Sequence, residues 1–153
     1  MRISAKSDYA VRAAIVLAVA RAGEPVKADT IARSQEIPLK FLLNILSELK
    51  HGRIVTSHRG IHGGFLLARP AAEITVADVI RAMEGPLASV HEILPENLSY
   101  PPPSESLQQV WVAVRASLRS VLETVTIADL ASGSLPEAVL SLNASPEAWS
   151  VRR

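Results

Sequence analysis

Three side chains able to read DNA bases lie close together in the first half of the chain. Lys40 and Asn44 are four residues apart, about one turn of a helix, and Arg59 follows beside Gly60. Lysine can donate to the acceptor atoms of guanine, and asparagine can pair with N6 and N7 of adenine in the major groove. An arginine on a narrow glycine loop can enter the minor groove. These residue types, in this order, predict contact with double-stranded DNA.

Two short helices joined by a tight turn are predicted to position the lysine and the asparagine. The first covers residues 27–34 and has Ile31 and Ala32 on its inner side. Pro38 suits the first position of the second helix, over residues 38–50, because the first turn needs no N–H from that residue. The inner side of the second helix contains Phe41, Leu42, Ile45, Leu46 and Leu49, and its polar side contains Lys40, Asn44, Ser47 and Lys50. This pattern is typical of a helix-turn-helix.

A β-hairpin is predicted directly after the second helix. We expect Gly52 to end that helix in the left-handed conformation. Strand-like residues occupy 54–57 and 65–67, and the loop between them contains three glycines, which suit a tight turn with positive φ. The hairpin tip would carry Arg59 and His62 forward. A helix-turn-helix followed by such a wing is typical of DNA-reading proteins.

The pattern extends over nearly the whole chain and resembles a known family. The residues that carry it are Lys6, Tyr9-Ala10-Val11-Arg12, Ile31-Ala32, Phe41-Leu42, Ile45-Leu46, Leu49, Arg59-Gly60, Gly63-Gly64-Phe65, Leu67-Ala68-Arg69-Pro70, Ile74-Thr75, Asp78-Val79-Ile80, Glu84-Gly85 and Val125-Thr126-Ile127-Ala128-Asp129-Leu130. With these residues the chain resembles the Rrf2-type winged helix-turn-helix transcriptional regulators. The resemblance implies a mainly α fold with a small β-hairpin, in which a winged helix-turn-helix domain is followed by a long dimerisation helix.

The DNA-contacting residues follow from position and from the resemblance. Pro38, Leu39 and Lys40 lie at the front of the second helix, where side chains can reach base edges. Leu43 stands where some relatives carry glutamate; leucine can touch a thymine methyl group but cannot accept a hydrogen bond from cytosine N4. The resemblance implies that Arg59 enters the minor groove. It places the phosphate contacts at Arg2, Lys6, Tyr9, Lys27 and Lys50.

Charge is distributed unevenly along the chain. Residues 1–69 hold 11 Lys and Arg against 5 Asp and Glu, a net charge of +6, whereas residues 70–153 hold 5 against 10, a net charge of −5. The basic half is the half with the DNA-reading pattern, as attraction to phosphates requires. Charge asymmetry also occurs in proteins that do not bind nucleic acid, so it supports the prediction without carrying it.

Cysteine is absent, which excludes disulfides, cysteine-bound zinc and thiol redox sensing. Many members of the resembled family hold an iron–sulfur cluster through three cysteines in the loop that corresponds to residues 87–103. Asp8, where some relatives supply a carboxylate ligand, and His91 are the remaining candidates here, but such clusters need mainly cysteine. We therefore predict no cofactor and no metal, with Asp8 as a solvated or capping carboxylate and His91 as an ordinary loop histidine.

Four segments are expected along the chain. They are a DNA-binding domain at 1–86, a Pro-rich loop at 87–103, a dimerisation helix at 104–130 and a C-terminal tail at 131–153. Within the first segment, Thr75 begins a helix in the manner of a capping box. The dimerisation helix carries apolar residues at alternating spacings of four and three, namely Leu107, Trp111, Val114, Leu118, Val121 and Val125.

That apolar stripe predicts a homodimer. At roughly 1.5 Å per residue, a helix over residues 104–126 is about 34 Å long, more than a small winged domain covers. Two-fold pairing would place two reading helices roughly 34–36 Å apart, which matches a palindromic operator. The alternative is that the stripe packs only within its own chain. Tyr100, Trp111 and His91 are candidates for lining an effector site, although packing in the core or the dimer is the better explanation for Trp111.

The expected function is that of a sequence-specific transcriptional regulator, a repressor rather than an activator, acting as a homodimer. Its partners would be operator DNA, a second copy and a small-molecule or protein effector of unknown identity. No apolar run approaches the ~18 residues of a membrane span, so a cytoplasmic protein without membrane association is expected. The alternatives are a weakly specific architectural DNA-binding protein and an interaction module that docks on an enzyme. The sequence contains no recognised catalytic motif, and an enzyme is not expected.

Overall fold

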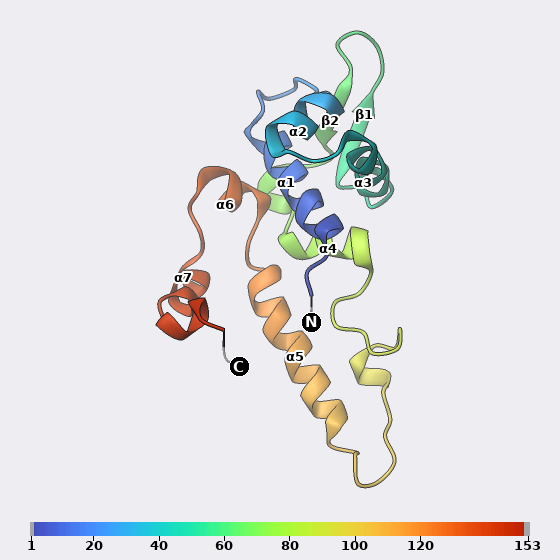
Figure 1. Ribbon diagram of the computed structural model, residues 1–153, viewed down its shortest axis with the longest axis vertical. Coiled ribbons are helices and arrows are strands. Elements are labelled where there is room, and N and C mark those ends of the chain that lie inside the picture. The colour runs from blue at the N-terminus through green and yellow to red at the C-terminus, as the bar shows by residue number, and fades with distance from the viewer. Residues whose placement is uncertain (1, 152–153) are drawn as a thin grey trace.

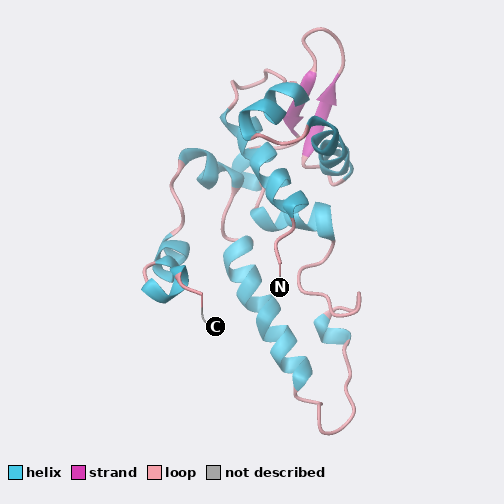
Figure 2. Cartoon of the chain, viewed as in Figure 1, coloured by secondary structure: helices cyan, strands magenta, loops and turns pink. Residues whose placement is uncertain are grey.

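The computed structural model describes residues 2–151, which form a mainly helical molecule with one small antiparallel sheet. Figure 1 shows the order of the elements, and Figure 2 shows that the hairpin lies at one end of the molecule. The elements are α1 (Ala5–Val19), α2 (Ala28–Gln35), α3 (Leu39–His51), β1 (Val55–His58), β2 (Gly64–Leu67), η1 (Ala71–Glu73), α4 (Val76–Glu84), η2 (Pro95–Asn97), α5 (Leu107–Leu122), α6 (Ile127–Ser132), α7 (Glu137–Asn143) and η3 (Pro146–Trp149).

The predicted helix pair is present as α2 and α3. The turn between them contains Glu36 in the left-handed conformation, at φ 54°, and the N–H of Ile37 donates to the carbonyl of Ala32 at 2.9 Å. Pro38 is the N-cap of α3, one residue before the predicted position. Its fixed φ and missing N–H suit a residue at a helix start. The short turn sets α3 at an angle to α2, as a helix-turn-helix requires.

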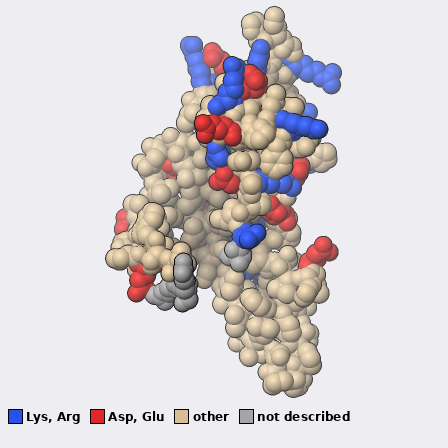
Figure 3. Space-filling model, in the orientation of Figure 1, with Lys and Arg blue, Asp and Glu red and all other residues tan. Residues whose placement is uncertain are grey.

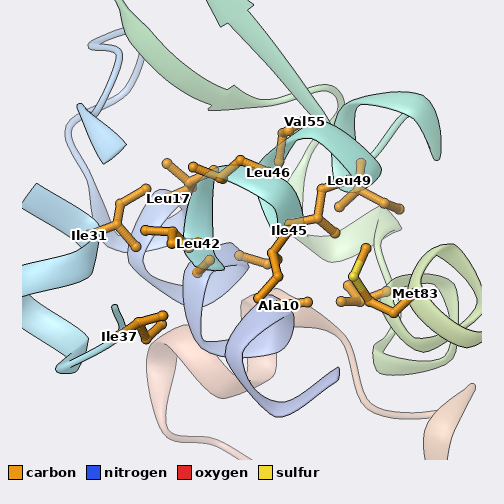
Figure 4. Packing of buried hydrophobic residues seen from close by; sticks show 14 of the residues in the cluster. Ala10, Leu17, Ile31, Ile37, Leu42, Ile45, Leu46, Leu49, Val55 and Met83 are labelled. Carbon is orange, nitrogen blue, oxygen red and sulfur yellow. The ribbon is translucent and has the colours of Figure 1, made fainter. Parts of the chain in front are cut away.

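One apolar core holds these helices and the hairpin together. Figure 4 shows side chains from α1, α2, α3, β1 and α4 meeting around the inner face of α3. Leu42, Leu46 and Leu49 are completely buried, as predicted, and each contributes about 1.5–3 kcal/mol relative to an exposed side chain. Phe41, predicted on the same inner face, is instead 40% exposed. Its ring lies at the edge of the core, where it meets Tyr9.

The hairpin pairs Val55 with Leu67 and His58 with Gly64. Its second strand is also bonded to the segment before α2, because Val26 and Phe65 exchange N–H to carbonyl hydrogen bonds of 2.9 and 2.8 Å. This approach leaves no room for a side chain at Gly64, whose Cβ would lie 2.5 Å from the Val26 carbonyl oxygen. The base of the wing is therefore fixed to the helix-turn-helix.

The end of α3 differs from the prediction. Gly52 has φ −73° and is not left-handed; Arg53 takes the positive φ, at 58°. Glycine is required at position 52 for space, because a Cβ there would lie 2.7 Å from the Cβ of Ala82 on α4. The close packing of α3 against α4 explains the glycine, and the sequence alone did not reveal that contact.

Helices α4 and α6 each begin with a capping box, and the two helix starts are paired with each other. We call this contact the joint and define it as residues 74–76 and 125–127. Thr75 and Thr126 each accept a hydrogen bond from an aspartate N–H three residues ahead, at 3.1 Å in both helices. The two segments pair as an antiparallel bridge, in which Val76 N–H donates to the Val125 carbonyl at 2.9 Å. The side chains of Ile74 and Ile127 are completely buried there.

The joint corrects the expected helix over 104–130. The long helix α5 ends at Leu122, and the Thr126 capping box begins the separate helix α6, which packs on α1. Val125, predicted as the last residue of the dimerisation stripe, is buried in the joint of its own chain. The chain therefore leaves the winged domain after α4 and returns to it at α6.

The second half of the molecule is more open. None of the residues of α5 is fully buried, and the helix projects from the winged domain beside the loop that contains η2 (Figure 1). In the expected tail, α7 and η3 pack on each other, with Leu142 58% and Trp149 78% exposed. Among residues 2–151, no helix is both long and apolar enough to cross a membrane.

Candidate nucleic-acid interface

The outer face of α3 combines polar and apolar side chains at its first two turns. Lys40 and Asn44 are exposed, and Leu39 and Leu43 beside them are 41% and 47% exposed. The opposite face of the helix is held in the core by its buried leucines and Ile45. This orientation leaves a donor, an amide and two apolar groups on one solvent-facing surface, the combination that can contact base edges and thymine methyl groups.

The wing presents a narrow tip of exposed residues. Gly60 has φ 101°, which a residue with a side chain rarely adopts, and a Cβ at Gly63 would overlap the His58 carbonyl oxygen. These constraints fold the loop tightly and expose Arg59 and His62. Ile61, which the sequence analysis did not single out, is 81% exposed between them. An exposed apolar residue beside an arginine at a loop tip suits insertion into a DNA groove.

A cleft of about 480 Å³ separates the wing tip from the start of α2. It is lined by Glu24, Pro25, Lys27, Ile61, His62 and Gly63. Lys27 is exposed and is the N-cap of α2, so this cation belongs to the residue at the helix N-terminus. Free N–H groups and a cation at one position favour an anion such as a phosphate. The structure brings Lys27 and His62 together, which their separation in the sequence did not predict.

Lys50 connects α3 to the wing. Its ammonium group donates to the hydroxyl of Ser57 on β1 at 2.7 Å, and the side chain is exposed. The hydrogen bond holds the charge at the base of the hairpin, next to the face formed by α3. A backbone phosphate at this point would meet a cation that is already oriented.

Two predicted phosphate contacts on α1 also support α3. Lys6 forms an ion pair of 2.8 Å with Glu48, and both side chains are only partly exposed. The ring of Tyr9 meets Phe41 edge to face, with 5.8 Å between ring centroids. The structure thus places both residues between α1 and α3. A role in phosphate binding would come in addition to this packing role.

Arg12 connects two helices, a role that the sequence analysis did not identify. Its guanidinium donates to the backbone carbonyl and, at 3.3 Å, to the side chain of Gln35, the last residue of α2. It also lies 5.2 Å from the centroid of the Tyr9 ring and 3.3 Å from Asp8. Arg12 therefore ties α1 to the turn of the helix-turn-helix. Asp8, considered above as a ligand candidate, is the partner of this arginine.

Arg2 lies apart from the front of α3. It lines a cavity of about 210 Å³ between α1, α4 and α5, together with Ser7, Glu84 and Leu118. The hydrogen bond from Ser4 is the main cause that lowers the pKa of Glu84; burial opposes it, and the hydrogen bond from Ser7 and the charge of Lys6 add to the lowering. The predicted phosphate contact of Arg2 thus has no support from the α3 surface.

The cationic side chains follow the predicted distribution. Figure 3 shows Lys and Arg gathered over the end of the molecule that carries α2, α3 and the wing, whereas the visible face of the α5 end is almost free of them. Interspersed acidic groups keep this surface from being uniformly positive. A DNA backbone would nevertheless meet the positive end of the molecule first.

The predicted dimerisation residues on α5 lie on its half-buried side. Leu107, Trp111, Val114, Leu118 and Val121 are neither fully buried nor fully exposed. The indole N–H of Trp111 donates to the hydroxyl of Tyr100 at 3.0 Å, so two of the effector-site candidates contact each other. His91, the third, is exposed in the loop at φ 50°. Val110 remains 51% exposed on the outer side of the helix.

The donor atoms do not fit an iron site. The chain has no cysteine, and no group of three or more His, Asp and Glu able to hold a metal ion occurs among residues 2–151. Iron–sulfur clusters require mainly thiolate ligands. No step of the function described below is therefore assigned to iron.

Comparison with known proteins identifies one family. The model of the Rrf2 family, described as an iron-dependent transcriptional regulator, matches residues 3–133. The chain is 54% identical over 142 residues to Rv1287 of Mycobacterium tuberculosis strain H37Rv, which is named as an HTH-type transcriptional regulator. That similarity covers 93% of this chain and 88% of the relative.

Solved structures agree with the sequence comparison. The CymR (YrzC) structure, described as the global cysteine regulator of Bacillus subtilis, has a TM-score of 0.73 at 31% identity and covers 87% of this chain and 98% of its own. The structure of IscR from T. potens has a TM-score of 0.70 at 27% identity and covers 98% and 97%. The winged helix-turn-helix and the helix that follows it are therefore shared with DNA-binding regulators.

Proposed function

The chain belongs to the Rrf2 family of DNA-binding transcriptional regulators, and we propose that it binds a specific palindromic operator as a homodimer and represses transcription. Its fold and its relatives are those of regulators rather than enzymes. The single observation that carries the homodimer is α5, a helix of 16 residues rich in Val and Leu without one fully buried residue in its own chain. A second copy would cover such a helix, because two-fold homodimers are the commonest assemblies.

In the proposed complex, α3 lies in the major groove. Lys40 and Asn44 contact base edges, while Leu43 contacts a thymine methyl group. Pro38 and Leu39 lie at the entry of the helix to the groove. The support is the exposure of all these side chains on one face, opposite a fully buried one.

The wing supplies the second set of contacts. Arg59 enters the minor groove, and His62 accompanies it at the tip. Lys27 and Lys50 hold phosphates on either side, since one lies beside the α2 N-terminus and the other is oriented by Ser57. Lys6 and Tyr9 contribute from α1 through the support they give to α3.

Repression follows from occupancy of the operator. A dimer whose two wings and two α3 helices cover adjacent turns of DNA excludes other proteins from the same site. Control of such a protein would come from an effector that alters the dimer or the winged domain. The effector proposed below requires no iron.

Fluorescence anisotropy tests the proposed function. A labelled duplex from the promoter upstream of the protein's own gene is compared with a scrambled duplex, at low and at physiological salt. We expect tight binding to the promoter duplex alone, which weakens with salt because counterions are released. Equal affinity for both duplexes would indicate an architectural DNA-binding protein. Binding to neither duplex, together with a co-purifying enzyme, would indicate a docking module.

A further inference from the structure

Three arginines converge on a cleft far along the chain from the DNA-reading residues. The cleft has a volume of about 230 Å³ and is lined by Arg81, Pro86, Leu87, Glu96, Arg115 and Arg119. We call it the arginine cleft. Arg81 comes from α4, Arg115 and Arg119 come from α5, and Glu96 lies on η2. The cleft thus lies where the winged domain, the loop and the long helix meet.

The guanidinium of Arg115 has more N–H donors than hydrogen-bond partners. Its side chain is only 19% exposed, and Nη1 donates to the carboxylate of Glu96. A guanidinium carries five N–H donors. Among residues 2–151, the guanidinium of Arg115 makes this one hydrogen bond to protein, and none of its other nitrogen atoms is buried without a partner. Since Arg115 lines the cleft, its remaining donors are available to a ligand there.

Each arginine of the cleft is balanced by a carboxylate of the same chain. Glu123 accepts from Arg81 and, at 3.0 Å, from Nε of Arg119, while Asp78 lies 3.9 Å from Arg81. Glu96 is held in place by Arg115 and by a bond of 3.0 Å from the Gln108 side chain to its backbone carbonyl. Its own backbone N–H, and then Arg115, lower the pKa of Glu96, so the carboxylate is charged at neutral pH.

The position of Glu96 differs from that of the other two carboxylates. Glu123 and Asp78 belong to the well-packed ends of α5 and α4, whereas Glu96 lies on a short 3-10 turn in the connecting loop, and its side chain is 47% exposed. An ion pair whose carboxylate is this exposed to solvent contributes little to stability, even though Arg115 itself is more buried. The carboxylate of Glu96 is therefore the group that a ligand can replace at small cost.

We propose that the arginine cleft is an effector site for a small ligand bearing a phosphate group, and that Glu96 occupies the phosphate position until the ligand displaces it. Arg115 would be its central contact, with Arg81 and Arg119 on either side. A phosphate offers three oxygen acceptors in different directions and up to two negative charges, which suits guanidinium groups that come from two helices. A carboxylate offers acceptors in one plane only.

Displacement of Glu96 would release η2 from α5. Two contacts of Glu96, to Arg115 and to Gln108, connect the loop to that helix in the ligand-free protein. The neighbouring Trp111, one turn before Arg115, is bonded to Tyr100 of the same loop. A change in the loop therefore reaches the residues proposed for dimerisation. This regulatory consequence rests on the proposed function, whereas ligand binding itself does not.

Tryptophan fluorescence and calorimetry test the site without DNA. The chain has two tryptophans, so Trp149→Phe leaves Trp111 as the reporter beside the cleft. Inorganic phosphate and glycerol 3-phosphate are titrated separately at constant ionic strength, with acetate as the planar anion. We expect saturable binding at one site per chain for at least one phosphate compound, and much weaker binding of acetate. Preference for glycerol 3-phosphate would identify a phosphorylated metabolite rather than free phosphate as the ligand.

Variants assign the binding to the cleft. Arg115→Gln should weaken phosphate binding by roughly tenfold or more. Glu96→Gln should strengthen it by up to about fivefold, because the weak internal competitor loses its charge. Arg21→Gln is the matched control, since Arg21 is 83% exposed and pairs with Glu24 outside the cleft. Equal binding by Arg115→Gln and the unaltered protein, or no increase with Glu96→Gln, would overturn the proposal.

Two further measurements separate a failure of the phosphate site from a failure of the proposed function. Circular dichroism establishes that Arg115→Gln is folded; if it is not, the Glu96→Gln and Arg119→Gln variants decide the question. The operator experiment is then repeated with the ligand present. If the unaltered protein binds the operator but no phosphate compound, the site is rejected and the proposed function remains. If it binds phosphate but no operator, the site remains and the proposed function is rejected.

Discussion

The winged domain and α5 contain similar apolar residues but bury them very differently. In α3, Leu42, Leu46 and Leu49 are completely buried by the chain's own α1, α4 and hairpin. In α5, no residue reaches that state, and Val110 remains 51% exposed. The apolar face of the first region is covered within one chain, whereas that of the second is left for the proposed partner copy. The comparison teaches that the stability of the chain depends mainly on the winged domain, and that the proposed assembly depends on α5.

The largest expected effect is in the winged domain. Leu46→Asp would bury a charge without a partner in the centre of the core. We expect a loss of about 5 kcal/mol or more, comparable with the whole stability of a domain this size, so that the variant fails to fold. Circular dichroism and urea unfolding would detect this loss. A variant that is folded and stable would contradict the core described for α3.

A charge on α5 should affect assembly and leave folding intact. Val110→Asp costs little within the chain because the side chain is already half exposed. We expect it to weaken the dimer by roughly 2–4 kcal/mol, since the charge would be buried against the partner. Analytical ultracentrifugation measures the dimer, and Val110→Thr, nearly equal in shape, is the control. An unchanged dimer would mean that another face of α5 pairs.

A substitution in the wing tests whether DNA binding depends on the winged domain and is independent of assembly. Arg59→Ala should weaken binding to the specific duplex by about 1–3 kcal/mol, because it removes a minor-groove contact. Arg21→Ala, at an exposed arginine between α1 and α2 that pairs with Glu24, should change it little. Anisotropy titrations of both variants provide the measurement. Neither variant should alter the dimer, so an effect of Arg59→Ala on assembly would contradict the separation of the two regions.

The smallest expected effect is a pH dependence of the α5 region. Hydrogen bonds from Arg81 and then Arg119 lower the pKa of Glu123, and the pKa of Glu96 is lowered by its own N–H and Arg115. Their contribution to stability is present above the ordinary carboxyl value of 4.5 and is lost as pH falls through the lowered values. Trp111 fluorescence in the Trp149→Phe background should change below pH ~4.5 while the core remains folded. Glu96→Gln should reduce that change; simultaneous loss of core and α5 signals would argue against it.

Local sequence patterns were sufficient for the helix-turn-helix and the wing. The spacing of Leu42, Ile45, Leu46 and Leu49 gave the buried side of α3, and the glycines gave the tight tip. These features depend on neighbours within a few residues. The positions of Lys40, Asn44 and Arg59 on exposed surfaces followed from the same patterns.

Features that depend on distant contacts were not predicted. Phe41 fits the inner pattern of α3 but meets Tyr9 of α1 at the edge of the core. Gly52 ends α3 as predicted, but its lack of a side chain serves the contact with Ala82 rather than a left-handed conformation. The role of Arg12 depends on the position of Gln35 after folding. Only the three-dimensional arrangement brings these pairs together.

The break between α5 and α6 is an instructive case. Thr75-Val76-Ala77-Asp78 was recognised as a capping box, and Thr126-Ile127-Ala128-Asp129 has the same spacing of threonine and aspartate. A local signal for the second box was therefore present. The apolar stripe that runs up to Val125 nevertheless favours one continuous helix. A capping box takes precedence over a stripe when helix ends are assigned.

In topological terms, α5 belongs to a segment that leaves the winged domain and returns to it at the joint, rather than to a separate C-terminal extension. The segment leaves the winged domain after Glu84 and returns at Thr126, where the joint pairs it with the start of α4 and where Ile74 and Ile127 are both completely buried. Removing everything after residue 86 would consequently take away part of the core that supports the DNA-reading helix. Because α6 packs on α1, a rotation of α5 would act on the winged domain through the joint as well as through its own contacts with α4. In a two-fold assembly, those contacts would set the distance between the two DNA-reading helices.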